Sequence, residues 1–122
     1  MAGKKFPNKK AVEDQKENLF GANLRNMSLV DAKLSEADMG LADLTNADLS
    51  GADLDGADLT NAKLNDVKTT TGAVSLNGAD LRNANLNGAD LEGADLRDAN
   101  LTGAMLRGQN LDDLKSSGAI IN

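Results

Sequence analysis

A hydrophobic residue recurs at every fifth position over most of this chain. Leu or Met occupies each fifth position from 24 to 64, and Leu occupies each fifth position again from 76 to 111. The residue two places earlier is usually Ala, and the residue between them is usually Asp or Asn. The two residues that follow are mostly small or polar. This period of five constrains the fold more than any other feature.

Neither a single helix nor a straight strand can bury such a pattern. Five residues turn an α-helix by about 500°, so the leucines would spiral around its axis without forming a stripe. In a strand, an odd spacing places successive leucines on opposite faces. The chain must therefore turn once per repeat, with Ala and Leu inward and the Gly, Asn and Asp residues at the corners. A chain that turns the same way after every repeat winds into a solenoid.

The repeats resemble the pentapeptide-repeat family, whose motif is A-(D/N)-L-x-x. The matching stretches are ADLTN ADLSG ADLDG ADLTN and GADLRNANLNGADLEGADLRDANL. The resemblance covers roughly residues 22–66 and 74–113. It implies an all-β fold, a right-handed quadrilateral β-helix in which four repeats form one square coil. In this fold the central leucines stack in four ladders along the axis, and the Asp or Asn side chains bond to corner backbone groups.

The ladders follow from the register on each side of a break between Leu64 and Leu76. Before the break the predicted ladders are Leu24–Leu44–Leu64, Leu29–Leu49, Leu34–Leu54 and Met39–Leu59. After the break they are Leu76–Leu96, Leu81–Leu101, Leu86–Leu106 and Leu91–Leu111.

Five segments are expected along the chain. They are an N-terminal cap (1–21), repeat coils (22–66), a loop at the register break (67–73), further coils (74–113) and a C-terminal cap (114–122). Asn8 is expected to cap a short helix over roughly residues 9–16. The side chains expected to close the N-terminal end of the bore are Phe6, Val12, Leu19 and Phe20. At the other end, Ile120 and Ile121 either plug the bore or pair with a second copy.

Composition argues against catalysis. The chain has no His and no Cys, which excludes the usual zinc sites, a Cys nucleophile and a Ser-His-Asp relay. Most Asp residues share one outward repeat slot, so no pair of carboxylates has the two different environments that acid–base catalysis needs. Residues 53–58 begin like a calcium-binding loop, but Ala57 stands where an oxygen ligand belongs. We therefore expect no enzyme activity, no catalytic residue, no cofactor and no metal.

The charge pattern indicates a possible interaction surface. The formal net charge is −6. If the break takes up two sides of a coil, one face collects six carboxylates in segments that hold no cation. These are Asp31, Asp48, Asp90, Glu92, Asp112 and Asp113. If the break takes up one side, only the last four stay together.

The sequence thus predicts a non-enzymatic scaffold or protein-interaction module, with partner capture through one face or through the 67–73 loop. The alternative is an acidic DNA mimic that binds DNA gyrase, because the resemblance extends to quinolone-protection members of the family. We expect an unidentified protein partner, no direct nucleic-acid binding, no membrane association, and a monomer or weak end-to-end homodimer. The expected location is the cytoplasm, or the periplasm or thylakoid lumen if a targeting segment has been removed.

Overall fold

The backbone hydrogen bonds of each repeat show why the chain winds as it does. In the repeat 42–46, the N–H of Ala42 bonds to the carbonyl three residues earlier, which closes a corner turn. The N–H of Asp43 donates to the preceding coil, whereas those of Leu44 and Asn46 donate to the following coil. The N–H of Thr45 donates to the Asp43 side chain at 3.0 Å. Every backbone donor of the repeat is therefore paired, and the predicted role of the Asp or Asn slot is confirmed.

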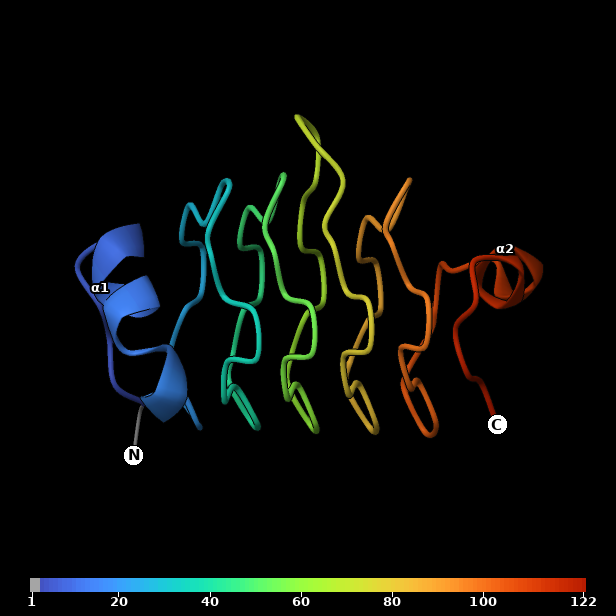
Figure 1. Ribbon diagram of the computed structural model, residues 1–122, viewed down its shortest axis with the longest axis horizontal. Coiled ribbons are helices and arrows are strands. Elements are labelled where there is room, and N and C mark those ends of the chain that lie inside the picture. Colours follow the sequence, from blue (N-terminus) through green and yellow to red (C-terminus); the bar gives the residue numbers. More distant parts are fainter. Residues whose placement is uncertain (1–2) are drawn as a thin grey trace.

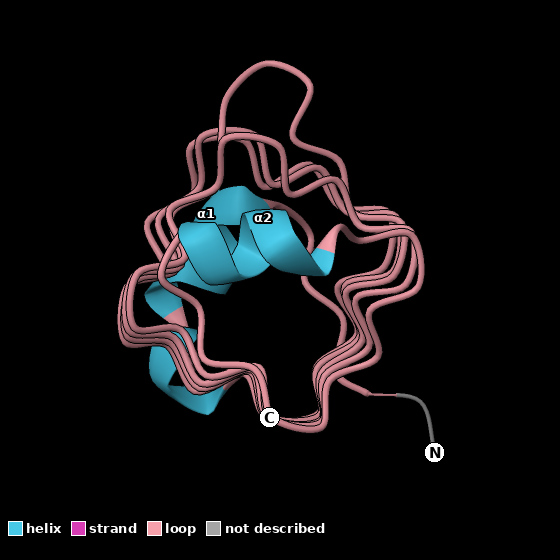
Figure 2. Ribbon diagram, turned by 90° about the vertical axis from the view of Figure 1, so that its right-hand side faces the viewer, coloured by secondary structure: helices cyan, strands magenta, loops and turns pink. Residues whose placement is uncertain are grey.

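A computed structural model describes residues 3–122 as a repeat β-solenoid (Figure 1). Neighbouring coils are joined by single parallel β-bridges such as Asp43↔Lys63 and Asp38↔Asp58. From Asn23 to the break these bridges join residues 20 apart, which gives four five-residue sides per coil. The coils superimpose when they are viewed end-on (Figure 2). Within the described residues, pairing does not extend into longer strands, because each side turns after a few residues.

Four ladders of inward side chains fill the bore, one on each side of the coil. We call the four sides A, B, C and D. Side A holds Leu24, Leu44, Leu64, Leu86 and Leu106, and side B holds Leu29, Leu49, Thr69 and Leu91. Side C holds Leu34, Leu54, Leu76 and Leu96, and side D holds Leu19, Met39, Leu59, Leu81, Leu101 and Ile121. Most of these residues, together with the alanines two places earlier, form one continuous buried core.

The register break takes up two sides and is narrower than predicted. Val67 and Thr69 are buried, and Lys68 pairs with Asp48 of the coil before it. Residues 67–69 are therefore an ordinary part of side B, with Thr69 in the place of a leucine. The N–H of Gly51 donates to the carbonyl of Gly72, so Thr70 and Thr71 are the two extra residues. They form the hairpin that projects beyond the other coils (Figures 1 and 2).

The N-terminal end of the bore is covered by α1 (Lys9–Asp14) and the short 3-10 helix η1 (Lys16–Asn18). The side chain of Asn8 caps α1 by accepting the N–H of Ala11 at 2.9 Å. Val12 is fully buried under this helix. Lysine and glutamate side chains of the cap bond to exposed backbone groups of the first coil. They are Lys9 on Val30 O, Lys16 on Ser35 O, and Glu13 on Lys33 N.

One expectation for this end is wrong. Phe20 does not close the bore, because it occupies the outward position after Leu19 and is 63% exposed. Its ring lies instead over the backbone of Gly40 on the next coil. Phe6 does lie half-buried against the core.

At the other end the coils stop earlier than predicted. Helix α2 (Leu111–Ser116) begins inside the 74–113 segment, and Leu111 is 47% exposed, so the predicted Leu91–Leu111 ladder is wrong. Gln109 replaces the small inward residue, and its amide bonds to the carbonyls of Leu86 and Ala89. Asn110 then accepts the N–H of Asp113 and caps a helix with acidic residues in its first turn, a favourable arrangement.

After α2 the chain returns to side D for its last residues. Ile120 pairs with Asn100, which places Ala119 and Ile121 half-buried against the core and leaves Ile120 45% exposed. Leu114 is the one buried side chain of α2. Figure 2 shows α2 lying over one part of the ring, and Leu91, Ala104 and Leu106 of the last coil are only partly buried, so α2 closes only part of this end.

Candidate interaction surface on side B

The six carboxylates predicted to form one surface are only partly together. Asp48 and Asp90 occupy the outward slot of side B two coils apart, and Glu92 follows on the same side. Asp31 lies at the corner of the first coil, with a positive φ of 58°. Asp112 and Asp113 belong to the first turn of α2.

Lys68 interrupts this acidic column, so the expectation of a face without a cation is wrong. It stands in the outward slot between Asp48 and Asp90. The repeat pattern alone does not reveal this position, because the twelve-residue spacing from Leu64 to Leu76 places Lys68 in the predicted loop 67–73. Side B up to residue 93 thus carries four carboxylates and one lysine.

The negative charge is also spread around the solenoid. Over residues 22–108, side C carries five acidic and two basic residues, and side D carries three acidic and one basic residue. Side A alone has more basic than acidic residues, three against two. Net charge therefore does not single out side B, and its distinguishing feature is the hairpin.

The hairpin is held to the adjoining coils by polar contacts. The N–H of Thr71 donates to the Ser50 hydroxyl at 3.2 Å, and the Thr69 hydroxyl donates to the carbonyl of Asp90 at 3.2 Å. A shallow depression of about 580 Å³ separates the hairpin from the following coil. We call this surface the loop face; it is lined by residues 69–73, Asp90, Glu92 and Gly93.

Asp48 is held in its ionised form next to the hairpin. Its carboxylate accepts the Ser50 hydroxyl at 2.6 Å and the Ser50 N–H at 3.0 Å. These bonds, together with the charge of Lys68, keep the pKa of Asp48 below its ordinary value. Asp48 therefore supports the corner of the coil as well as contributing charge.

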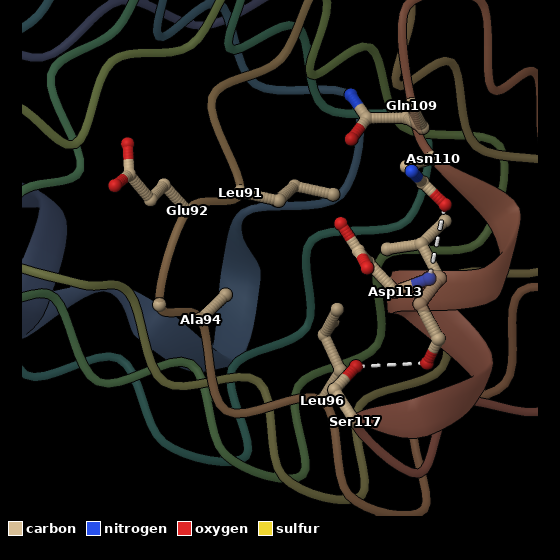
Figure 3. A pocket seen from close by; sticks show the side chains of 10 residues that line it. Leu91, Glu92, Ala94, Leu96, Gln109, Asn110, Asp113 and Ser117 are labelled. Carbon is tan, nitrogen blue, oxygen red and sulfur yellow. Dashed lines mark hydrogen bonds between the residues drawn. The ribbon is translucent and has the colours of Figure 1, made fainter.

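A second hollow lies beneath α2, and we call it the α2 cleft (Figure 3). It has a volume of about 440 Å³. Leu91, Ala94, Leu96 and Leu114 supply its apolar lining. Its polar lining residues are Glu92, Gln109, Asn110, Asp113 and Ser117. Figure 3 shows the Asp113 carboxylate directed toward Leu91, whereas Glu92 points to the outer side.

The sequence carries one signal for helix α2, which borders the cleft. Asn110 followed three residues later by Asp113 is typical of a helix start, where the side chain of the first residue caps the N–H of the other. The continuing period of five concealed it.

Neither a metal cluster nor a membrane-spanning helix is found within residues 3–122. Within residues 3–122 no group of three or more acidic side chains is arranged to hold a metal ion. Across the same residues, no helix has the length and apolar character needed to cross a membrane.

Comparison with known proteins agrees with the repeat architecture. The family model described as pentapeptide repeats matches residues 28–66 and 75–113 in eight copies. A search of curated proteins finds no match.

Two solved structures illustrate the likeness in fold. A trypsin-treated form of QnrB1, a plasmid-mediated fluoroquinolone resistance protein, is 16% identical with a TM-score of 0.60 over 85% of this chain. The chain spans 59% of that protein's length. The protein alr5209, a pentapeptide repeat protein from Nostoc Pcc 7120, is 25% identical with a TM-score of 0.53, and the match covers 100% of this chain and 99% of the other.

Proposed function

This chain belongs to the pentapeptide-repeat family, and on that premise we propose that it is a non-enzymatic interaction module that binds a protein partner through the loop face. The observation that carries the proposal is the hairpin of Thr70 and Thr71. It is the one place in residues 22–108 where the repeat length changes. Elsewhere on the coils the backbone path repeats itself, so only the side chains distinguish one coil from the next.

The surroundings of the hairpin suit a polar partner with basic groups. Asp90 and Glu92 line the depression beside it, and neither forms an ion pair within the described part of the chain. Two exposed hydroxyl groups at the tip add hydrogen-bonding capacity. Loops on rigid scaffolds commonly carry recognition, because the scaffold fixes their position.

The bore offers no alternative site for chemistry. It is filled by the four ladders of buried side chains, whereas a substrate pocket needs space and convergent polar groups. We therefore keep the proposal that the chain is not an enzyme. The right-handed winding implied by the family resemblance, and the expected cytoplasmic location, stay predictions.

The DNA-mimic alternative gains no specific support. Lys68 breaks the acidic column, and the negative charge is shared among sides B, C and D. Likeness to QnrB1 at 16% identity concerns the fold alone. Inhibition of topoisomerase supercoiling that disappears when Asp90, Glu92, Asp112 and Asp113 are neutralised together would favour it over the loop face.

Site-specific cross-linking tests the proposed function. A photoreactive amino acid replaces Thr71 on the hairpin or, as the matched control, Thr60 on side D, in cells that produce the protein. We expect discrete protein adducts from position 71 only, and their loss in the double variant Asp90→Asn/Glu92→Gln. Equal adducts from both positions, or none from position 71, would contradict the proposal.

A further inference from the structure

We propose that the α2 cleft is a binding site for an extended peptide segment of a partner protein, one that carries an aliphatic side chain beside a basic one. This inference rests on the proposed function and deepens it, because Glu92 and Gly93 line both the loop face and the α2 cleft. A partner docked on the hairpin can therefore continue into the cleft.

The first argument is the backbone of the last coil at the cleft. In earlier coils, the N–H groups of Leu49, Gly51 and Leu54 all donate to the following coil. The corresponding donors around the cleft are the N–H groups of Leu91, Gly93 and Leu96. Within residues 3–122 these three have no hydrogen-bond partner, because α2 replaces the strands that would have supplied one. Leu91 and Gly93 lie on side B, and Leu96 lies past the corner on side C, so an extended peptide that bends at this corner provides carbonyl oxygens at the spacing that the edge requires.

The second argument is the difference between donors and acceptors along this edge. The amide of Gln109 donates to the carbonyls of Leu86 and Ala89, at 3.2 and 2.7 Å. Those two carbonyls are satisfied by the chain itself, whereas within residues 3–122 the three N–H groups and the Ala94 carbonyl on side C have no partner. The edge therefore offers three donors and one acceptor, a ratio that calls for a ligand that mainly accepts hydrogen bonds from it.

The third argument concerns the side chains that such a peptide would carry. Leu91 and Ala94 are only partly buried and form an apolar floor, and the buried Leu96 also lines the cleft. An aliphatic side chain placed there removes apolar surface from water. The cleft lies within the range of volumes usual for ligand sites.

Charge selects the neighbouring side chain of the peptide. Asp113 and Glu92 line the cleft, and neither carboxylate has an ion-pair partner in the described chain. The Asp113 carboxylate is directed across the cleft toward Leu91 (Figure 3). A Lys or Arg two residues from the aliphatic one lies on the same face of an extended segment and would reach it, so the expected motif is an aliphatic and a basic residue two positions apart.

The test is a titration of the ¹⁵N-labelled full chain with a defined peptide, acetyl-Lys-Leu-Val-Lys-Val-amide, followed by NMR. Its control is the same peptide with Glu in place of both Lys residues. We expect shifts and slower hydrogen exchange at the N–H groups of Leu91, Gly93 and Leu96, with a Kd on the order of 1 mM or tighter. The N–H groups of Leu49, Gly51 and Leu54 serve as internal references that do not move.

Two variants make the result specific. Asp113→Asn should weaken the basic peptide roughly threefold, the size expected for one exposed ion pair, and should not weaken the acidic peptide, because the same change removes a repulsion. Asp112→Asn is the matched control, because this neighbour in α2 does not line the cleft. Equal weakening by both variants would overturn the assignment to the cleft.

Two further outcomes of the titration would overturn the proposal. No shift at the three N–H groups, or shifts confined to another side, would overturn the proposal. In the protein without peptide, hydrogen exchange at these groups that slows as the protein concentration rises would show that a second copy occupies the cleft. That result would also overturn the proposal. Cross-linking from position 71 is independent of this peptide, so the proposed function can stand when the cleft proposal fails.

Discussion

Lys68 lies beside Asp48 on neighbouring coils, with their backbones joined in one parallel bridge. The N–H of Leu49 donates to the carbonyl of Lys68 at 2.8 Å, which fixes the register of the pair. The lysine therefore separates Asp48 from Asp90 along side B. Because neighbouring residues of such a ladder lie close together, the charge at position 68 decides whether it attracts or repels the carboxylates of Asp48 and Asp90.

Replacing this lysine by an acidic residue should destabilise the solenoid. Lys68→Glu places three like charges in successive coils, and we expect a loss of about 0.5–1 kcal/mol in the free energy of unfolding. Lys68→Gln, which removes the charge without reversing it, should cost less. Urea unfolding at low salt measures both, and the difference should shrink at high salt because of screening. A difference that does not respond to salt would contradict an electrostatic cause.

The ladders predict unequal costs for two leucines that look alike in sequence. Leu59 is fully buried in side D, so Leu59→Ala should cost about 2–5 kcal/mol of unfolding free energy. Leu111 occupies the same repeat position but is exposed on α2, and Leu111→Ala should leave stability almost unchanged. Chemical denaturation compares them. Similar losses would mean that Leu111 enters the bore after all.

Leu41 is a strained corner residue. Its φ of 57° lies in the left-handed region, where corners elsewhere in the solenoid hold mostly Gly, Asn or Asp. Leu41→Asn should therefore raise the unfolding free energy by about 1 kcal/mol. Leu41→Ala keeps the strain and removes the same exposed side chain, so it serves as the control. A thermal melt in which Asn and Ala behave alike would contradict this account.

Stability should fall in acid. Hydrogen bonds from the Arg82 guanidinium hold the pKa of Asp80 below its ordinary value, and Arg97 has the same effect on the pKa of Asp95. A carboxyl whose pKa is lower in the folded state stabilises the fold above its unfolded pKa of about 3.9, and this contribution is lost as pH falls through the folded pKa.

The variant Asp80→Asn tests this pH dependence. Between neutral pH and pH about 3, its unfolding free energy should fall less than that of the parent chain. Glu17→Gln is the control, because the Glu17 side chain makes no hydrogen bond within residues 3–122. If both variants lose the same free energy as the parent, Asp80 does not contribute to the acid sensitivity.

Deleting the hairpin should separate recognition from folding. Removal of Thr70 and Thr71 restores the regular repeat length and removes the hydrogen bond from the Thr71 N–H to the Ser50 hydroxyl. We expect the unfolding free energy to change by less than about 1 kcal/mol, because a shorter loop costs less entropy to close. Circular dichroism and urea unfolding check this expectation. A large loss of stability would show that the hairpin is structural.

The period of five was sufficient to predict the solenoid and most of its ladders. It succeeds because one buried Leu and one turn per repeat leave the chain a single way to hide its apolar side chains. The position of Lys68 did not follow, since twelve residues between Leu64 and Leu76 allow more than one path. Helix α2 was missed because Leu111 keeps the repeat spacing while Gln109 is too large for the inward slot.

The Asp or Asn slot has a consequence for how this surface can change. In most repeats its side chain accepts the one backbone N–H that neither the corner nor an adjoining coil can reach, as Asp58 does for Thr60. The amide is thereby satisfied whatever side chain follows the central leucine. Substitutions can therefore change the outward side chains of one coil at a time without changing the path of the backbone.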